Sequence, residues 1–331
     1  MILLIQYTLV FASVLLLVAL GGCVSEHSGV INLGLEGIMV MGALGGALVM
    51  KFMTPGVEQT LEAGGIISGG RAFGMFLATF CASVLVGVVY SALLAVACIN
   101  LKADQTIVGT ALNMLGTALA TVVVKSMNTA LNPDDHSSEI FYGKVKDFFV
   151  TKIGQFELSW FMIVAVILLI IVFILLYKTK FGLRLRACGE HPQAAASVGI
   201  SVFKMRWAGV LLSGFLGGAG GITYIISSGS MWKFENGVAG FGFLALAVMI
   251  FGAWHPIKIA GAALVFGVFR ALGNVHSAIT LFGWNWDDTI KLAPNIYNML
   301  PYIVSLIVLA FTSKNSKAPK AEGIPYDKGM R

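Results

Sequence analysis

Charged residues are scarce in this sequence. Asp, Glu, Lys and Arg make up 11% of its 331 residues, whereas a soluble domain carries roughly a quarter. A chain with so few charged side chains cannot cover a surface that faces water, which excludes a soluble globular protein. Hydrophobic residues make up 57% instead, and several apolar runs reach the roughly 18 residues needed to cross a bilayer. Phe73–Ala97, for example, contains no charge.

The sequence also lacks the motifs of enzymes. It has no G-x-x-x-x-G-K-[ST] phosphate loop, no H-E-x-x-H pair and no C-x-x-C pair among its four cysteines. These absences argue against an ATPase, a zinc hydrolase and a metal or disulfide framework in this chain. No stretch between the apolar runs is long enough to form a separate enzyme domain. We therefore predict a chain that is not an enzyme and binds no cofactor or metal.

The apolar runs predict an all-α, polytopic membrane bundle. They must be helices, because open strands leave backbone groups unsatisfied in lipid. Residues 1–313 are predicted to form the transmembrane domain, and the polar tail 314–331 is predicted to be disordered. We expect about nine spans, near 2–21, 30–50, 73–98, 105–124, 159–177, 206–228, 239–254, 257–275 and 296–313.

The distribution of charge predicts the orientation of the spans. The loop 178–205 and Arg206 carry several basic residues against one acid, Glu190, and the tail is also basic. Both are predicted to be cytoplasmic. Alternation then places the acidic loop Lys125–Ser159 outside, with the N-terminus outside and the C-terminus inside. We therefore attribute the net charge of +6 to cytoplasmic segments that lie next to membrane lipid, and not to nucleic-acid binding.

Polar residues occur where the second span opens. The run Ser28–Ala43 contains Asn32 and Glu36 among several glycines. Polar groups at this depth are costly, so they should face protein or a water-filled path. The glycines suggest that the helix starts partway through the membrane and leaves amides unpaired near Asn32.

A second stretch resembles the first at an offset of 208 residues. This second stretch, Asn236–Met249, aligns with the opening of the second span, and Gly29 and Gly34 fall on Gly237 and Gly242. In the predicted topology the two copies run in opposite directions. This pattern predicts an inverted repeat built around broken helices, where transporters place their substrate path.

A short helix is predicted inside the basic loop, at about 191–198. Pro192 suits the first position of a helix, and Gly199 suits the position just after its last residue. Two turns of helix are not stable alone, so another structure must pack against them.

Specific motifs now point to a family. The run from Gly182 to Ile200, G-L-R-L-R-A…G-E-H-P-Q-A-A…G-I, resembles the coupling loop of bacterial ABC importer permeases in the branched-chain amino acid and simple sugar group. Three more stretches resemble the subgroup for purine nucleoside uptake: S-G-V-I-N-L-G-L-E-G, L-K-A-D-Q-T-I-V-G-T-A-L-N and V-M-I-F-G-A-W-H-P. Together these resemblances cover residues 10 to 310.

The resemblance implies a set of partners in a bacterial inner membrane. These are an ATP-binding subunit, which would bind the ATP, a second permease subunit in a heterodimer, and an extracytoplasmic substrate-binding protein. In the family, coupling helices convey the closure of the ATPase dimer to the spans. The residues implied in that coupling are Gly182, Arg184, Arg186, Gly189, Glu190, Pro192, Ala194, Ala195 and Gly199.

The expected function is the translocation path for a small polar solute, with a nucleoside as the first choice. Riboflavin and a simple sugar stay open, and so does an ion-coupled secondary transporter, for which only Glu36 is an acid at depth. Each path residue has a structural alternative: Glu36 could cap helix amides, Asn113 could bond between helices and Phe241 could pack in the core. The candidate path residues are Asn32, Glu36, Asn113, Asn236 and Phe241.

Overall fold

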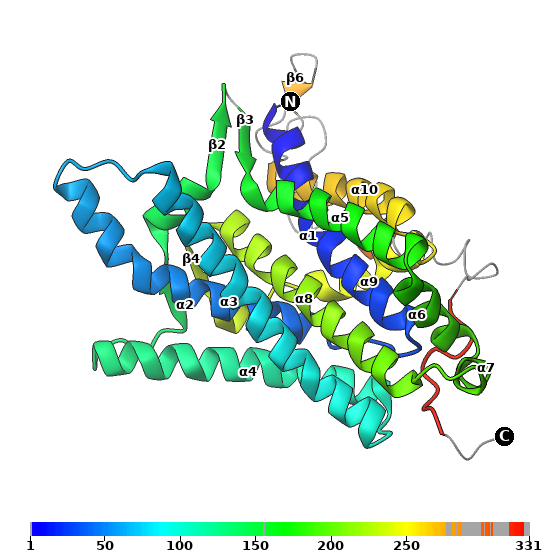
Figure 1. Cartoon of the computed structure of the whole chain (residues 1–331). Helices are drawn as coiled ribbons and strands as arrows, with labels where there is room; N and C mark the ends of the chain where they lie inside the picture. Colours follow the sequence, from blue (N-terminus) through cyan, green and yellow to red (C-terminus); the bar gives the residue numbers. More distant parts are fainter. Residues whose placement is uncertain are drawn as a thin grey trace.

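Long helices make up most of the structure, which is a computed structural model (Figure 1). It describes residues 2–154, 156–275 and 318–327, and the short pieces 280–281, 284–285, 299–300, 302–304 and 306. The helices are α1 (Ile2–His27), α2 (Leu35–Glu62), α3 (Gly69–Ala95), α4 (Gln105–Leu131), α5 (Trp160–Lys178), α6 (Lys180–Glu190), α7 (Pro192–Ser197), α8 (Val202–Ser228), α9 (Phe241–Phe251) and α10 (Pro256–Val275). A π-helical turn, Val96–Asn100, continues α3.

Eight helical segments in the described part of the chain are long and apolar enough to cross a membrane. They match the first eight predicted spans and confirm the all-α, polytopic bundle. Several are longer than predicted: α1 extends to His27 and α2 to Glu62. The ninth predicted span, 296–313, lies mostly outside the described residues.

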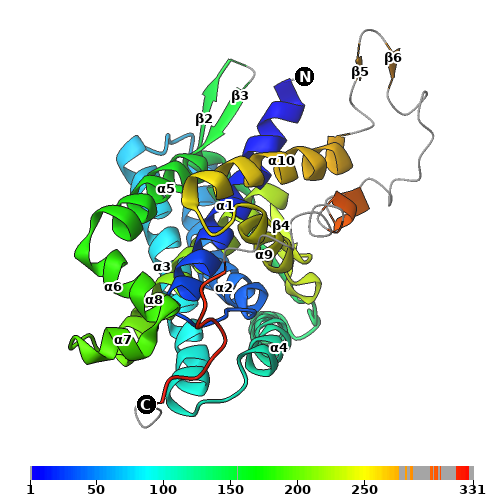
Figure 2. The same cartoon turned by 90° about the vertical axis from the view of Figure 1, so that its right-hand side faces the viewer.

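The predicted outer loop 125–159 contains short strands. One, β1 (Glu139–Phe141), pairs antiparallel with β4 (Met231–Lys233), and β2 (Val150–Ile153) forms a hairpin with β3 (Phe156–Ser159). The remaining short elements are the 3-10 helices Gly143–Phe149 and Phe234–Asn236 and the strands β5 (Thr280–Leu281) and β6 (Trp284–Asn285). The β2–β3 hairpin lies beside the start of α1, at the opposite end of the bundle from α6 and α7 (Figures 1 and 2). We call these ends the hairpin end and the α7 end.

Small residues bring the central helices into close contact. A Cβ on Gly42 of α2 would lie 2.5 Å from the Cα of Gly218 of α8. A Cβ on Gly221 would overlap the carbonyl oxygen of Met39. In lipid, helices associate through such close backbone approach, since the tails around them are as apolar as leucine. The glycines of α8 therefore fix the spacing of α2 and α8.

Large apolar side chains cover the outer faces of the bundle. Among them, Leu85 on α3, Met114 on α4 and Ile170 on α5 are all more than half exposed. A soluble protein rarely exposes so much apolar surface. These faces suit contact with lipid or with another membrane subunit.

The glycine contacts predict the outcome of one substitution. In Gly221→Ala the new Cβ meets the Met39 carbonyl, so α8 and α2 must separate, at a cost of about 1–3 kcal/mol. The control is Gly74→Ala on α3, where a Cβ has open space and alanine is the better helix former. We expect a lower midpoint of thermal unfolding in detergent for Gly221→Ala and an unchanged or higher one for Gly74→Ala. Equal midpoints would contradict this packing.

Candidate functional site

Two helix N-termini meet at Glu36. One carboxylate oxygen of Glu36 accepts the N–H of Gly240 at 2.8 Å, and the other accepts the N–H of Gly242 at 2.6 Å. The first N–H groups of a helix have no partner within it and carry a partial positive charge. Glu36, in the first turn of α2, thus caps the start of α9. We call this contact the α2–α9 junction.

From the junction the two helices run to opposite ends of the bundle. The far end of α2 leads into the start of α3 near the β2–β3 hairpin (Figure 1). The turn after α9 reaches the α7 end, where Trp254 Nε1 donates to Glu26 at the end of α1, at 2.5 Å. Eleven residues give α9 a length of about 16 Å, roughly half of the hydrocarbon thickness. α9 therefore has the length of a half-span, whereas α2, with 28 residues, is long enough to cross the hydrocarbon, so an inverted pair of broken helices stays a prediction.

Asn32 and Asn113 secure the start of α2. Asn32 Oδ1 accepts the N–H of Gly34 at 3.1 Å, and its Nδ2 donates to Ser213 Oγ at 2.8 Å. Asn113 Oδ1 accepts the N–H of Gly37 at 2.8 Å, and its Nδ2 donates to the Leu33 carbonyl at 2.8 Å. Both side chains are buried. The amides expected near Asn32 are thus capped by the two asparagines, and Glu36 caps the partner helix rather than its own.

The two remaining path residues lie near the start of α9. Phe241 is fully buried, with its ring 4.5 Å from the ring of Tyr224 and 5.7 Å from that of Phe11. The guanidinium of Arg270 lies 5.1 Å from the centre of the Phe241 ring. Asn236 is exposed, in the turn before α9. Phe241 thus has the surroundings expected of the structural alternative, packing in the core, and its role in a substrate path stays a prediction.

A cavity of about 340 Å³ lies beside these rings. It combines aromatic faces, hydroxyl groups, an amide and one cation. Its lining residues are Tyr7, Phe11, Tyr224, Ser227, Ser228, Trp232, Arg270 and Asn274. None of them was among the predicted path residues, although the aromatic residues at the ends of α1 and α8 are a signal that could have suggested them.

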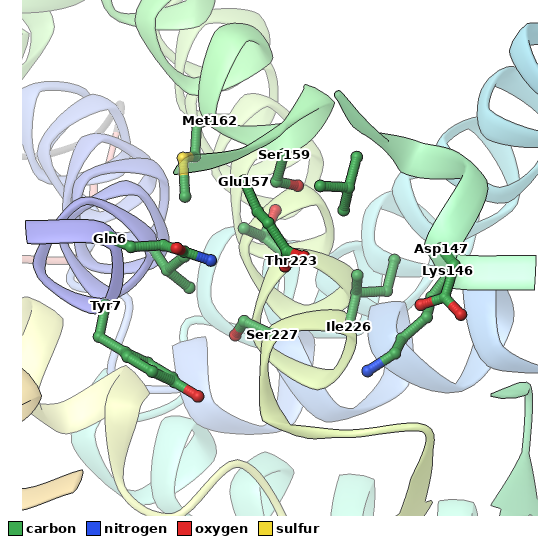
Figure 3. A pocket seen from close by; sticks show the side chains of 12 residues that line it. Gln6, Tyr7, Lys146, Asp147, Glu157, Ser159, Met162, Thr223, Ile226 and Ser227 are labelled. Carbon is green, nitrogen blue, oxygen red and sulfur yellow. The ribbon is translucent and has the colours of Figure 1, made fainter. Parts of the chain in front are cut away.

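A second cavity of about 180 Å³ adjoins the first, since Tyr7 and Ser227 line both. Figure 3 shows Gln6 and Tyr7 on α1 facing Thr223 and Ser227 on α8 across it. Its remaining lining residues come from α1, α5, α8, the 3-10 helix Gly143–Phe149 and the strands β2 and β3: Val10, Lys146, Asp147, Val150, Glu157, Ser159, Met162 and Ile226. We call the two cavities together the vestibule.

The short helix predicted in the basic loop is present as α7, Pro192–Ser197. Gly199, with φ of +84°, follows its end, in the left-handed region that glycine adopts without strain. The residues before it were expected to be a loop, but they form α6. There the Thr179 hydroxyl accepts the N–H of Gly182 at 3.1 Å and caps the helix start, a signal that the sequence offered.

The predicted coupling residues divide into two groups. Three hold α6 in place: a Cβ on Gly182 or Gly189 would overlap backbone of α5 or α1, and Arg186 lies 4.6 Å from the centre of the Tyr177 ring. Ala195 is also buried and Pro192 half-buried. The others have exposed side chains or backbone and could meet another protein: Arg184, Glu190, Ala194 and Gly199.

Removing the Glu36 carboxylate should destabilise the junction. In Glu36→Ala the amides of Gly240 and Gly242 lose their acceptors, which we expect to cost about 2 kcal/mol or more. The unfolding midpoint of Glu36→Gln should lie between those of Glu36→Ala and the unmodified protein, because an amide offers one acceptor oxygen instead of two. The control is Glu62→Ala, an exposed acid at the far end of the same helix. Thermal unfolding in detergent measures the effect, and equal midpoints for Glu36→Ala and Glu62→Ala would contradict the capping role.

Comparison with known proteins identifies the family of this chain. Residues 4–309 match the family model of the branched-chain amino acid transport system permease component. The guanosine ABC transporter permease protein NupQ of Bacillus subtilis is 37% identical, over 98% of this chain and 96% of that protein. In Lactococcus lactis subsp. cremoris, the nucleoside ABC transporter permease protein NupC is 36% identical over 97% of this chain and 95% of its own.

A second permease of the same bacterium is also similar. The nucleoside ABC transporter permease protein NupB of Lactococcus lactis is 24% identical, over 77% of this chain and 68% of that protein. The family match extends over nearly all of the spans described above. The chain therefore belongs to the family of branched-chain amino acid transport system permease components, and it is a multi-pass membrane subunit of an ABC transporter rather than an enzyme.

Proposed function

We propose that this permease carries nucleosides. The observation that carries the proposal is the identity of 36–37%, over nearly the whole chain, with permeases for guanosine and nucleosides. The vestibule supports it, because a nucleoside joins a flat aromatic base to a sugar with several hydroxyl groups. Aromatic rings such as Tyr7 and Trp232 offer stacking faces to a base, and Ser227, Asn274 and Gln6 offer hydrogen-bonding groups to a sugar.

The path is proposed to lead from the vestibule along the α2–α9 junction. Phe241, the first residue of α9, packs against Tyr224 of the vestibule, and Asn236 lies exposed in the turn before α9. Asn32, Glu36 and Asn113 would shape this path by holding the two broken helices in position, since their hydrogen bonds are made within the protein. The family assignment favours this importer over the ion-coupled alternative.

Tyr7 is the most direct test of the substrate class. It lines both cavities and is half-buried, with its ring 6.1 Å from that of Phe11. Stacking of a base on an aromatic ring contributes about 1–3 kcal/mol, so Tyr7→Ala should raise the KM of guanosine uptake about tenfold. Tyr7→Phe keeps the ring and should stay within about twofold of the unmodified protein.

The assay is uptake of radiolabelled guanosine by cells that carry the complete transporter. Phe52→Ala, which removes a 70% exposed ring on α2, is the matched control and should leave the KM unchanged. Excess adenosine should compete with guanosine, whereas riboflavin and glucose should not. Competition by riboflavin or glucose alone would overturn the nucleoside assignment.

We also propose that the α7 end is cytoplasmic and docks the ATP-binding subunit. The basic residues of α6 support this orientation, and it places the N-terminus and the vestibule outside. Leu183 is 63% exposed and Val198 75% exposed beside Arg184, an apolar and basic surface that suits a protein partner. A second permease is proposed to complete a heterodimer, since Lactococcus lactis has two nucleoside permeases similar to this chain. A substrate-binding protein would deliver the solute to the hairpin end.

Ala194 provides the test of the coupling surface. It is exposed on α7, so Ala194→Arg places a bulky charge in the docking surface without disturbing the core. We expect guanosine uptake to fall at least about tenfold, as a loss of roughly 1.4 kcal/mol or more in docking would give, with membrane insertion unchanged. Ala63→Arg, an exposed alanine after α2 at the hairpin end, is the control and should transport normally. Unchanged uptake by Ala194→Arg would argue against docking at α7.

A further inference from the structure

The segment Ala318–Asp327, here called the inner strap, lies against the α7 end (Figures 1 and 2, red). It belongs to the tail whose polar composition predicts disorder, but here it is packed against the bundle. Ala321 and Tyr326 are 6% and 7% exposed, and the Tyr326 ring lies 5.6 Å from that of Phe203 in a T-shaped contact. The strap is ordered, contrary to the prediction, because apolar side chains follow the polar stretch and pack against the start of α8.

The strap connects the coupling region to elements that are distant in sequence. On the coupling side, the N–H of Ala321 donates to the Gly189 carbonyl at 2.8 Å, and Gln193 Nε2 of α7 donates to the Asp327 carbonyl at 3.2 Å. On the other side, Lys102 Nζ, between α3 and α4, lies 3.0 Å from Asp327 Oδ2. A displacement of α7 would therefore pull on the strap, and the strap on the α3–α4 connection.

Arg206 links the strap to the segment that leads into α2. It lies in the first turns of α8 and is 1% exposed, and its Nη1 donates to the Ile324 carbonyl of the strap at 2.9 Å. Its Nη2 lies against Gly29, where a Cβ would be only 2.9 Å away. Gly29, with φ of +91°, begins the connection from α1 to α2, three residues before Asn32. One guanidinium thus touches both the strap and the segment that leads into the broken helix.

The buried groups under the strap favour its release. Arg206 Nε and Nη2 have no hydrogen-bond partner among the described residues, and a buried cation without full partners is destabilising. The Glu322 carboxyl lies beside that of Glu26, and burial raises the pKa of Glu322. Water would solvate these groups once the strap moved away. The docked strap therefore covers groups that are costly to bury, and its contacts with Lys102 and Gln193 are made by exposed side chains, which suits a segment that moves.

We propose that the inner strap is a mobile coupling element, and that Arg206 is a positioning residue that links displacement of α7 to the start of α2. The proposal rests on the proposed docking of the ATP-binding subunit at α7. In the docked state the strap holds α7, α8 and the α3–α4 connection together. Release of the strap during each ATP cycle frees Gly29 and the start of α2 to move.

A reversible cross-link tests whether the strap must move. Lys102→Cys and Asp327→Cys are combined in a chain whose four native cysteines are replaced, and the complete transporter is reconstituted in liposomes. Joining the two thiols with a cleavable bifunctional reagent should abolish ATP-driven guanosine uptake. Cleavage of the linker should restore it, whereas each single-cysteine variant should stay active under the same treatment. Uptake at the unlinked rate by fully cross-linked protein would overturn the proposal.

Substitution of Arg206 provides a second measurement. Arg206→Met removes the buried charge and the bond to Ile324, so folding should be retained, but the guanosine taken up per ATP hydrolysed should fall about tenfold. Arg206→Lys keeps a charged donor and should recover part of this ratio. A purely structural role would lower the amount of folded protein and leave the ratio unchanged, which would count against Arg206 as a positioning residue.

The two proposals can fail separately. If the strap proposal alone is wrong, the cross-linked protein transports normally while Ala194→Arg still lowers guanosine uptake. If docking at α7 is wrong, Ala194→Arg transports normally in protein without the cross-link. In both experiments the rate of uptake is compared with that of the protein whose linker has been cleaved.

Discussion

The contact of the Glu36 carboxylate with the amides of Gly240 and Gly242 is the constraint on which the rest of the structure depends. A helix that starts inside a bilayer leaves backbone N–H groups without water. The starts of α2 and α9 meet at one place here, and one carboxylate from α2 accepts from amides at the start of α9. The asparagines at positions 32 and 113 satisfy the start of α2 in turn. Without these bonds the amides at both helix starts would lose their acceptors, which is costly away from water.

Close packing gives this junction a rigid frame. The second half of α1 is buried along its whole length, and α8 packs through its glycines on α2 and α3. Such contacts leave little room for adjustment, because a single methyl group would overlap backbone atoms. Close packing of this kind favours displacement of whole helices over local adjustment within them.

The two ends of the bundle are specialised for different contacts. The hairpin end contains the vestibule, where aromatic rings and polar groups lie together. The α7 end presents a short helix and a basic, partly apolar surface, held by the strap. The α2–α9 junction lies between them and is linked to both, through Phe241 on one side and through Gly29 and Arg206 on the other. Contacts within the fold therefore connect the two ends through the segments around the starts of α2 and α9.

The sequence by itself determined the class of protein, the first eight spans and the short helix α7, because these depend on local composition, on length, and on Pro192 and Gly199. It also located the polar residues of the broken helices. Tertiary structure alone decided which amides Glu36 caps, since its partners are more than 200 residues away. It likewise decided that Gly182 and Gly189 serve packing, that aromatic residues of α1 and α8 share one vestibule, and that a polar tail docks beside a buried arginine. These features depend on which surfaces meet in the folded chain, and such contacts between distant segments leave no periodic pattern in the sequence.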